Sequence, residues 1–174
     1  VRHESQYKFL DRFSTCSLSE SQFAVSYAMA ENTFAVTQTA IGQYPIMDTI
    51  DPKQLAENRI AQPVEEGLIV LSCGKTIQNT SIKIIDEQGN MLDERQIGEI
   101  LIQSDCMLTA YHNRPDLKPF TDGWYCTGDM GYIADDEIYI IGRKKDLIIN
   151  AGKNVYPQDI ESIVNMIDGI YKGR

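Results

Sequence analysis

Apolar residues recur at two different spacings along this chain, and each spacing predicts a different kind of element. Near the amino end, Tyr7, Leu10 and Phe13 recur every three residues, with Phe9 beside them and polar residues at the other positions between them. This is the spacing of one face of a helix, so we expect an amphipathic helix that ends near Ser14.

A second helical pattern lies near the carboxyl end. Pro157 suits the first turn of a helix, and Gly169 belongs to the residue type that most often follows a helix end. Between them lies one apolar stripe at helical spacing, made of Ile160, Ile163, Val164 and Ile167. We expect a helix that starts at Pro157 and is ended by Gly169.

Short apolar runs bounded by turn residues predict strands in the middle of the chain. Residues 81–86 alternate in polarity, and Gln88, Gly89 and Asn90 then supply turn residues, which favours a hairpin or meander. The expected strands are residues 23–27, 67–72, 81–86 and 98–104.

A further hairpin is expected around Asp135 and Asp136, which are turn residues between two apolar runs. Alternation after this turn places Ile138 and Ile140 on one face of the strand. The other face then carries Tyr139 and Ile141.

The segment 41–66 is polar and interrupted by turn residues. Within it, Asp51 and Pro52 are placed as the cap and first-turn proline of a helix through about Ile60. The residues leave two interpretations open, a plain surface excursion and an inserted element.

Composition narrows the classes of partner. The chain has 174 residues, enough for one domain or parts of two, with 43% hydrophobic and 24% charged residues, which is a globular composition. Its formal net charge of −9 disfavours binding to nucleic acid or to an anionic membrane. No apolar run approaches the ~18 residues of a membrane span.

The cysteines are widely spaced and form no CxxC pair, which is typical of free thiols in a reducing cytosol rather than of a disulfide framework or a metal site. They are Cys16, Cys73, Cys106 and Cys126. The polar first residues do not have the pattern of a signal peptide, so we expect a cytoplasmic protein.

Two charged residues next to glycines are the first candidates for chemistry. Asp129 ends the sequence Thr127-Gly128-Asp129, and Arg143 follows Gly142 at the end of the expected hairpin. A carboxylate and a guanidinium held at element boundaries suit a polar ligand with paired hydroxyls or a phosphate. By themselves the residues also allow a turn-capping aspartate.

Three motifs in order along the chain carry a resemblance to a known family. They are TGD at 127–129, GRKKDLI at 142–148 and YPQDIE at 156–161, preceded by GEILIQSDCMLTAYHNRP at 98–115. This combination resembles the adenylate-forming superfamily of acyl-CoA synthetases, luciferases and peptide-synthetase adenylation domains. The resemblance covers essentially the whole chain and is densest between Gly98 and Glu161.

The resemblance implies a mixed α+β, β-rich fold in three parts. Residues 1–41 would end an α/β subdomain of the large amino-terminal domain. Residues 42–142 would form a distorted β-barrel subdomain, and residues 143–174 the hinge and the first part of the small carboxyl-terminal α+β domain. The motifs expected elsewhere in the family, a phosphate-cradling loop and a catalytic lysine, are not found in this sequence, so we interpret it as an excerpt of a longer enzyme.

The same resemblance assigns roles to particular residues. Asp129 would accept hydrogen bonds from both ribose hydroxyls of the nucleotide, and Arg143 would also reach the ribose. Lys145 stands at the family's interdomain hinge, although Lys144 and Lys145 by themselves suggest only a solvated pair. Placement in strands and turns makes structural roles the expectation for Gly98, Glu99, Tyr111 and Arg114, and Trp124 and Tyr125 are expected in the core.

The sequence YAMAE at 27–31 resembles the family's tyrosine-glycine-x-threonine-glutamate motif. By this resemblance Tyr27 would lie against adenine, and Glu31 would be a catalytic residue that helps hold Mg²⁺. By itself, Glu31 reads as a solvated glutamate at a helix start. Ala28 and Ala30 replace the motif's glycine and threonine; alanine at the second position is common in the fatty acyl-AMP ligases, whose longer spacer the segment 41–66 also resembles.

The resemblance therefore implies part of an enzyme that uses ATP and Mg²⁺ to convert a fatty acid, or another carboxylate, into acyl-AMP. The preferred acceptor of the acyl group is the thiol of an acyl carrier protein. The alternatives are a long-chain acyl-CoA synthetase, which uses coenzyme A, and a noncatalytic module if the chain acts by itself. The remainder of the parent enzyme would be a partner in either enzyme.

Overall fold

The computed structural model describes residues 3–150, 153–165, 167 and 169–170. Its helices and short 3₁₀ turns are α1 (His3–Arg12), η1 (Ser14–Cys16), η2 (Glu20–Gln22), η3 (Ala30–Asn32), α2 (Pro52–Asn58), η4 (Lys144–Asp146) and α3 (Pro157–Val164). Its strands are β1 (Ser26–Ala28), β2 (Ala35–Gln38), β3 (Met47–Ile50), β4 (Leu68–Leu71), β5 (Lys75–Thr76), β6 (Thr80–Ile85), β7 (Gly98–Ser104), β8 (Phe120–Thr121), β9 (Trp124–Ala134), β10 (Glu137–Arg143), β11 (Ile148–Asn150) and β12 (Lys153–Val155).

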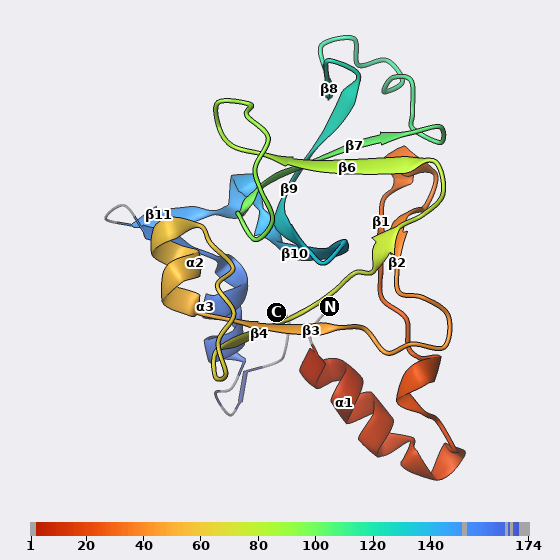
Figure 1. Cartoon of the computed structure of the whole chain (residues 1–174), viewed down its shortest axis with the longest axis vertical. Helices are drawn as coiled ribbons and strands as arrows, with labels where there is room; N and C mark the ends of the chain where they lie inside the picture. The colour runs from red at the N-terminus through yellow and green to blue at the C-terminus, as the bar shows by residue number, and fades with distance from the viewer. Residues whose placement is uncertain (1–2, 151–152, 166, 168, 171–174) are drawn as a thin grey trace.

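A curled antiparallel sheet in the order β10-β9-β7-β6 dominates the architecture, with β8 paired to one end of β9 (Figure 1). Smaller sheets surround it: β1-β2-β5, β3-β4 and β11-β12. The chain is thus β-rich with helices at its margins, which confirms the expected fold class.

Both faces of the curled sheet are covered by apolar side chains. On one face Tyr132, Tyr139 and Met130 pack with Ile50 of β3 and Leu55 of α2. On the other face a separate cluster combines β1 and β2 with β6 and β7, through Val25, Tyr27, Val36, Ile84, Ile100 and Ile102. Long strand β9 lies between the two clusters and carries residues into both.

Local signals in the sequence placed several elements correctly. Asp51 caps α2, because its Oδ1 accepts hydrogen bonds from the backbone N–H of Lys53 at 2.7 Å and of Gln54 at 3.3 Å. Asp135 and Asp136 form the turn between β9 and β10 with φ of 54° and 64°, the left-handed conformations that a tight hairpin turn requires. Asp86 similarly anchors the turn after β6 by accepting from the N–H groups of Gln88 and Asn90.

Two element boundaries were wrong. The expected strand 23–27 is β1, Ser26–Ala28; the N–H of Val25 bonds to Thr39 Oγ1 instead of entering the strand ladder. The last helix ends at Val164 and not at Gly169. There the hydrogen bonding changes from four-residue to three-residue spacing, as the N–H of Ile167 bonds to the carbonyl of Val164.

The apolar stripe of the last helix is open to solvent in this chain. Ile163 is 63% exposed, and Ile160, Val164 and Ile167 are exposed as well. Among the described residues, no helix is long and apolar enough to cross a membrane.

Candidate nucleotide site

Strand β9 arranges one buried row of polar side chains. Tyr125, Thr127 and Asp129 lie at every second position of β9 and all three are buried, although the pairing with β7 changes register here and Gly128 has a φ of 71°. Thr127 Oγ1 donates to the carbonyl of Ile100 at 2.8 Å and accepts from the N–H of Asp129 at 2.9 Å. The backbone N–H of Asp129 is therefore linked through the Thr127 hydroxyl to the neighbouring strand β7.

The Asp129 carboxylate lies between two donors from distant parts of the chain. Its Oδ1 pairs with Arg143 Nε at 2.8 Å, and its Oδ2 accepts from the Tyr27 hydroxyl at 2.5 Å. Strand pairing brings Arg143 there, since Arg143 lies opposite Asp129 in the β9–β10 ladder. The structure thus brings together three of the candidate residues, Tyr27, Asp129 and Arg143.

Burial fixes the direction of the Tyr27 hydrogen bond. Desolvation, followed by the hydrogen bond to Asp129, raises the pKa of Tyr27 far above its usual value. The phenol is therefore neutral at physiological pH and donates its proton to the carboxylate. Tyr27 itself is only 8% exposed, so little of its ring is accessible to a ligand.

The Asp129 trio, defined as Tyr27, Asp129 and Arg143, keeps unused hydrogen-bond acceptor capacity, and the Asp129 side chain itself is 7% exposed. A carboxylate offers about four lone-pair sites, and the two protein donors use about two of them. The Arg143 side chain is 54% exposed, so the trio is open to solvent on the guanidinium side. The arrangement can accept two further hydrogen bonds, which is what a ligand with two adjacent hydroxyls provides.

Glu31 lies in η3, close enough for the positive charge of Arg143 to affect it. A backbone hydrogen bond within Glu31 itself is the largest cause that lowers its pKa, followed by the Tyr111 hydroxyl, which donates to Oε1 at 2.9 Å; Arg143 contributes a smaller part. The carboxylate is consequently ionised at neutral pH.

The Glu31 carboxylate fits a magnesium site completed by a substrate. Among the described residues, no group of three or more His, Cys, Asp or Glu is placed to hold a metal ion. Mg²⁺ is, however, usually held by one or two carboxylates together with substrate phosphates and water. A single ionised Glu31 carboxylate with one oxygen bonded to Tyr111 satisfies that requirement from the protein side.

Tyr111 and Tyr125 were not predicted as site residues. Tyr111 was expected to be structural and Tyr125 a core aromatic, yet their hydroxyls lie 2.8 Å apart and the Tyr111 hydroxyl also contacts Glu31. Tyr125 is buried as expected, but its hydroxyl is part of this network. Its spacing of two and four residues from Thr127 and Asp129 on an alternating strand was the signal that could have identified it.

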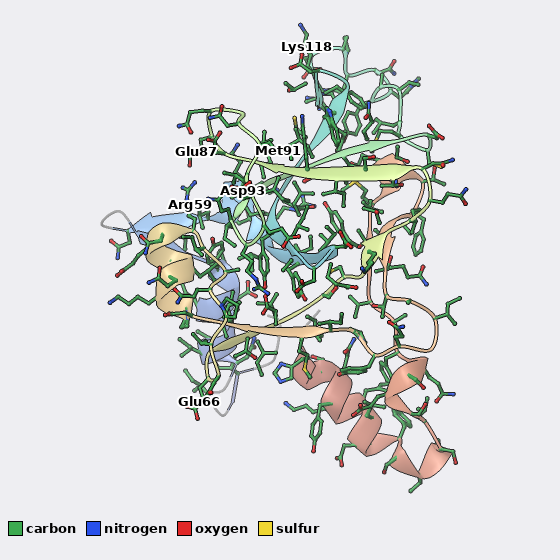
Figure 2. The ribbon with its side chains drawn as sticks, viewed as in Figure 1. Arg59, Glu66, Glu87, Met91, Asp93 and Lys118 are labelled. Atoms are coloured by element: carbon green, nitrogen blue, oxygen red, sulfur yellow. The ribbon has the colours of Figure 1, made fainter. Side chains whose placement is uncertain are left out.

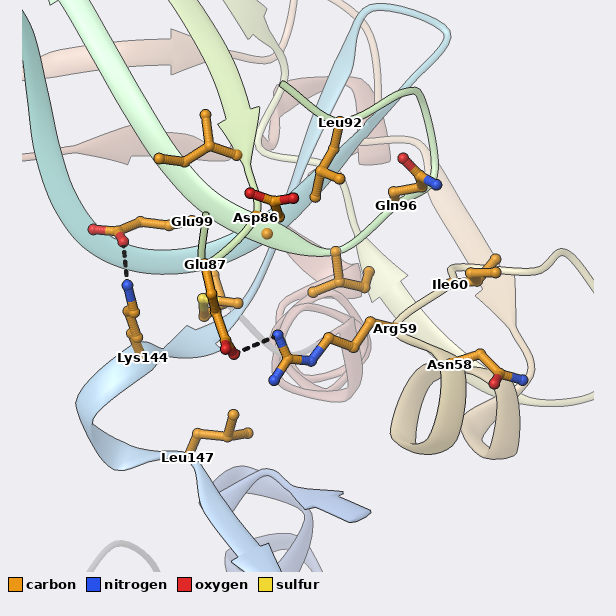
Figure 3. A pocket seen from close by; sticks show the side chains of 14 residues that line it. Asn58, Arg59, Ile60, Asp86, Glu87, Leu92, Gln96, Glu99, Lys144 and Leu147 are labelled. Atoms are coloured by element: carbon orange, nitrogen blue, oxygen red, sulfur yellow. Dashed lines mark hydrogen bonds and ion pairs between the residues drawn. The ribbon is translucent and has the colours of Figure 1, made fainter. Parts of the chain in front are cut away.

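The lysines after Arg143 lie outside the trio. Lys144 Nζ pairs with Glu99 Oε2 of β7 at 2.6 Å, and Lys145 is exposed in η4. A pocket of about 190 Å³ lies beside this segment and includes Lys144, Leu147 and Arg59 in its wall (Figure 3). Arg59 and Glu87 pair across it at 2.8 Å on one side of the molecule (Figure 2). None of Tyr27, Glu31, Asp129 or Arg143 lines this pocket, so it is distinct from the candidate site.

Comparison with known proteins shows the family to which this chain belongs. No family model matches the chain. The "Putative acyl-CoA synthetase" of Caulobacter vibrioides (strain NA1000 / CB15N) is 34% identical over 173 residues, covering 95% of this chain and 30% of that protein.

Solved structures agree with this relationship. A structure from studies of fatty acyl-adenylate ligases from E. coli and L. pneumophila superimposes with a TM-score of 0.92 at 30% identity, over 99% of this chain and 32% of that one. A fatty acyl-adenylate ligase from L. pneumophila, in complex with acyl adenylate and pyrophosphate, gives a TM-score of 0.76 at 31% identity, over 97% and 31%. The chain spans about a third of the length of these relatives and belongs to the adenylate-forming superfamily of acyl-CoA synthetases and acyl-AMP ligases.

Proposed function

We propose that this chain is the nucleotide-binding part of a longer ligase that activates a fatty acid as acyl-AMP and passes the acyl group to the thiol of an acyl carrier protein. The observation that carries the proposal is the buried Asp129 carboxylate, held between the Tyr27 hydroxyl and Arg143 Nε with further acceptor capacity. That capacity matches the two adjacent hydroxyls of a ribose.

In this proposal each member of the trio has a separate task. Asp129 accepts hydrogen bonds from the two ribose hydroxyls, and the exposed part of Arg143 donates to the same sugar. Tyr27 contributes through its hydroxyl, which orients Asp129 Oδ2. The small exposed margin of the Tyr27 ring is the part that would lie against adenine.

Glu31 would hold Mg²⁺ on the nucleotide phosphates. Its ionised carboxylate and its nearness to the trio support this role. When bound, the metal would neutralise charge on the phosphate oxygens. Glu31 also acts together with Arg143, whose positive charge favours anionic groups in the same region.

The proposed chemistry has two steps. A carboxylate oxygen of the fatty acid attacks the α-phosphorus of ATP, the bond from that phosphorus to the bridging oxygen breaks, and pyrophosphate leaves. The acceptor thiol, having lost its proton to solvent, then attacks the acyl carbon, and AMP leaves with the electrons of the broken carbon–oxygen bond. Orientation and electrostatic stabilisation of charge at the α-phosphate would supply most of the rate acceleration.

Two features favour an acyl-AMP ligase over an acyl-CoA synthetase. Ala30 lacks the hydroxyl present in most of the superfamily, and relatives include fatty acyl-adenylate ligases at 30% and 31% identity. A long-chain acyl-CoA synthetase is the second candidate, favoured by the Caulobacter relative. By itself the 174-residue chain would be a noncatalytic module.

We also propose the domain division 1–41, 42–142 and 143–174, with the interdomain hinge at Lys145. The exposed stripe of α3 supports a third part that packs against residues outside this sequence. Strand β5, Lys75–Thr76, pairs with β2, so the second proposed part contributes one strand to the sheet of the first.

The test is an assay of the full-length protein with ATP, Mg²⁺ and a panel of fatty acids, in which pyrophosphate release and acyl products are measured. Acyl-AMP that persists in coenzyme A but transfers to a carrier protein is the expected result. Rapid formation of acyl-CoA would select the second candidate, and no pyrophosphate release with any carboxylate would refute both.

A matched pair of variants connects that activity to the site. Asp129→Asn should lower nucleotide affinity about 100-fold, because an amide replaces two acceptor sites by donors. Asp136→Asn, in the exposed hairpin turn, should leave nucleotide affinity unchanged. The isolated 174-residue chain should neither form acyl-AMP nor bind ATP tightly. Pyrophosphate release by the isolated chain would contradict the hypothesis that it is a noncatalytic module.

A further inference from the structure

The connection between β7 and β8 contacts the Glu31 segment at three points. The N–H of Leu108 donates to the carbonyl of Glu31 at 2.7 Å, and Thr33 Oγ1 donates to the carbonyl of Cys106 at 3.2 Å. The third contact is the Tyr111 hydroxyl on the Glu31 carboxylate at 2.9 Å. This connection ends beside β8, where Lys118 is labelled in Figure 2. Both the backbone and the side chain of Glu31 are therefore fixed by residues far along the chain.

A second tyrosine, Tyr125, contacts the hydroxyl of Tyr111. The Tyr125 hydroxyl lies 2.8 Å from the Tyr111 hydroxyl, and Tyr125 is 5% exposed whereas Tyr111 is half-buried. Because the Tyr111 proton is donated to Glu31, the Tyr111 oxygen accepts the Tyr125 proton. The order of donation is thus Tyr125 to Tyr111 to Glu31, a chain in which each hydrogen bond polarises the next.

The buried residues Tyr125, Thr127 and Asp129 of β9 connect this series of hydrogen bonds to the Asp129 trio. Tyr125 and Asp129 lie four residues apart on the same strand. The ring of Tyr125 is fixed at its other side by Phe120, whose ring centroid lies 5.6 Å away in an edge-to-face arrangement. One strand, irregular between Cys126 and Met130, therefore carries both the acceptor proposed for the sugar and the support of Glu31.

We propose that Tyr111, supported by Tyr125, is a positioning residue that holds the Glu31 carboxylate in the orientation that binds the magnesium ion of the bound nucleotide. This inference rests on the proposed function, since it needs a nucleotide on the trio. The Tyr111 hydroxyl donates to Oε1, and the other carboxylate oxygen, Oε2, would then bind the ion. Without the hydroxyl the carboxylate keeps its backbone hydrogen bond but loses its main side-chain contact, so the ion has to select among more orientations.

The experiment uses the full-length protein and a binding readout that does not depend on turnover. The rise in Tm caused by ATP is measured as a function of free Mg²⁺ concentration, without any carboxylate substrate. The quantity compared is the Mg²⁺ concentration that gives half of the full rise. Tyr111→Phe should raise it about tenfold, because a hydrogen bond to a charged group is lost, and Tyr125→Phe about threefold.

Saturating Mg²⁺ distinguishes positioning from a structural role. In Tyr111→Phe, excess Mg²⁺ should restore the full ATP-induced rise in Tm, and the Tm in EDTA without ATP should stay close to that of the wild type. The matched control is Tyr44→Phe, which removes a hydroxyl that donates only a long 3.4 Å hydrogen bond to Gln6 Oε1. Its Mg²⁺ requirement should not change.

The outcomes separate this inference from the proposed function. A wild-type protein without Mg²⁺-dependent nucleotide binding would refute the proposed function and this inference with it. A wild-type protein that binds, combined with an unchanged Mg²⁺ requirement in the tyrosine variants, would refute this inference alone. If Tyr111→Phe does not fold, the threefold change in Tyr125→Phe decides the question.

Discussion

Two trios of the same residue types occupy different places in this molecule. In the Asp129 trio, a buried aspartate accepts from Tyr27 at 2.5 Å and pairs with Arg143 at 2.8 Å. In what we call the Asp48 trio, Asp48 Oδ2 accepts from the Tyr132 hydroxyl at 2.8 Å and from Arg95 Nη1 at 2.9 Å. The chemistry of the two groups is nearly identical.

Their surroundings differ. Both donors of the Asp48 trio use the same oxygen, and Arg95 also donates to the carbonyl of Ala61. Tyr132 is 0% exposed and stacks on Tyr139 with ring centroids 4.7 Å apart. The Arg95 side chain is 29% exposed, against 54% for Arg143.

The comparison shows that residue types alone do not separate a binding site from a structural anchor. The two aspartate side chains are similarly buried, with 7% of Asp129 and 10% of Asp48 exposed, and each accepts from two side-chain donors. The difference lies in the arginine, because the more exposed Arg143 leaves the Asp129 trio open to solvent on one side. Asp48 instead ties β3 to β9 and to the loop that carries Arg95. The following predictions test this difference.

The largest expected effect is a loss of stability on removal of the charge of Asp48. Asp48→Asn removes the nearer and more buried of the two carboxylate partners of Arg95, the other being exposed Asp135 at 4.0 Å, and the free energy of unfolding should fall by about 3 kcal/mol. Urea unfolding measures it, with Asp136→Asn as the exposed control. A loss no larger than that of the control would mean that Asp48 is not an anchor.

Asp129→Asn should give the opposite result. Arg143 is half exposed and is solvated when its partner loses its charge, so the stability loss should stay below about 1 kcal/mol. Nucleotide affinity should fall about 100-fold, or about 2.7 kcal/mol, whereas Asp48→Asn should retain affinity at temperatures where it is folded. Isothermal calorimetry with ATP on both variants measures the contrast, and equal affinity losses would contradict it.

Alkaline pH should affect both trios in the same way. Burial is the main cause that raises the pKa of Tyr132 and of Tyr27, and hydrogen bonding to an aspartate adds to it. Above pH 10, the usual pKa of tyrosine, the unfolded chain loses phenolic protons that the folded chain retains. Stability should therefore be full below pH 10 and fall above it by up to about 1.4 kcal/mol per pH unit for each tyrosine.

The measurement is the urea midpoint as a function of pH between about 9 and 11, a range set by the ordinary tyrosine pKa. Unfolding above pH 10 releases protons from these tyrosines, and the number released is obtained from the pH dependence of the free energy of unfolding. Tyr132→Phe and Tyr27→Phe should each lower that number by about one proton per molecule. If a variant keeps the pH dependence of the wild type, the tyrosine that it replaces already ionises in the folded wild-type protein at its ordinary pKa.

The smallest effect is expected for an ion pair outside both trios. Lys144→Ala breaks the pair with Glu99, but Lys144 is 50% exposed, and the stability loss should be about 0.5 kcal/mol. Lys75→Ala, which breaks the exposed pair with Asp136 at 3.3 Å, is the matched control. If Lys144→Ala lost more than about 2 kcal/mol of stability and Lys75→Ala did not, the Lys144–Glu99 pair would behave as a buried ion pair.

Much of the local structure was predictable from the sequence. The cap at Asp51, the hairpin turn at Asp135 and Asp136, and β7 at Gly98–Ser104 follow from turn chemistry and alternation between near neighbours. The end of the last helix was not, because hydrogen bonding after Val164 changed without a glycine.

The site divides in the same way. The motifs pointed to Tyr27, Glu31, Asp129 and Arg143 as candidate site residues, whereas Tyr125 was expected only in the core. Only the tertiary structure placed Tyr111 on Glu31, 80 residues away, and gave Asp48 the same kinds of partner as Asp129, a tyrosine and an arginine. The reason is physical: turns and strand faces depend on neighbours along the chain, whereas contacts across such separations depend on sheet register and loop packing, which no local pattern encodes.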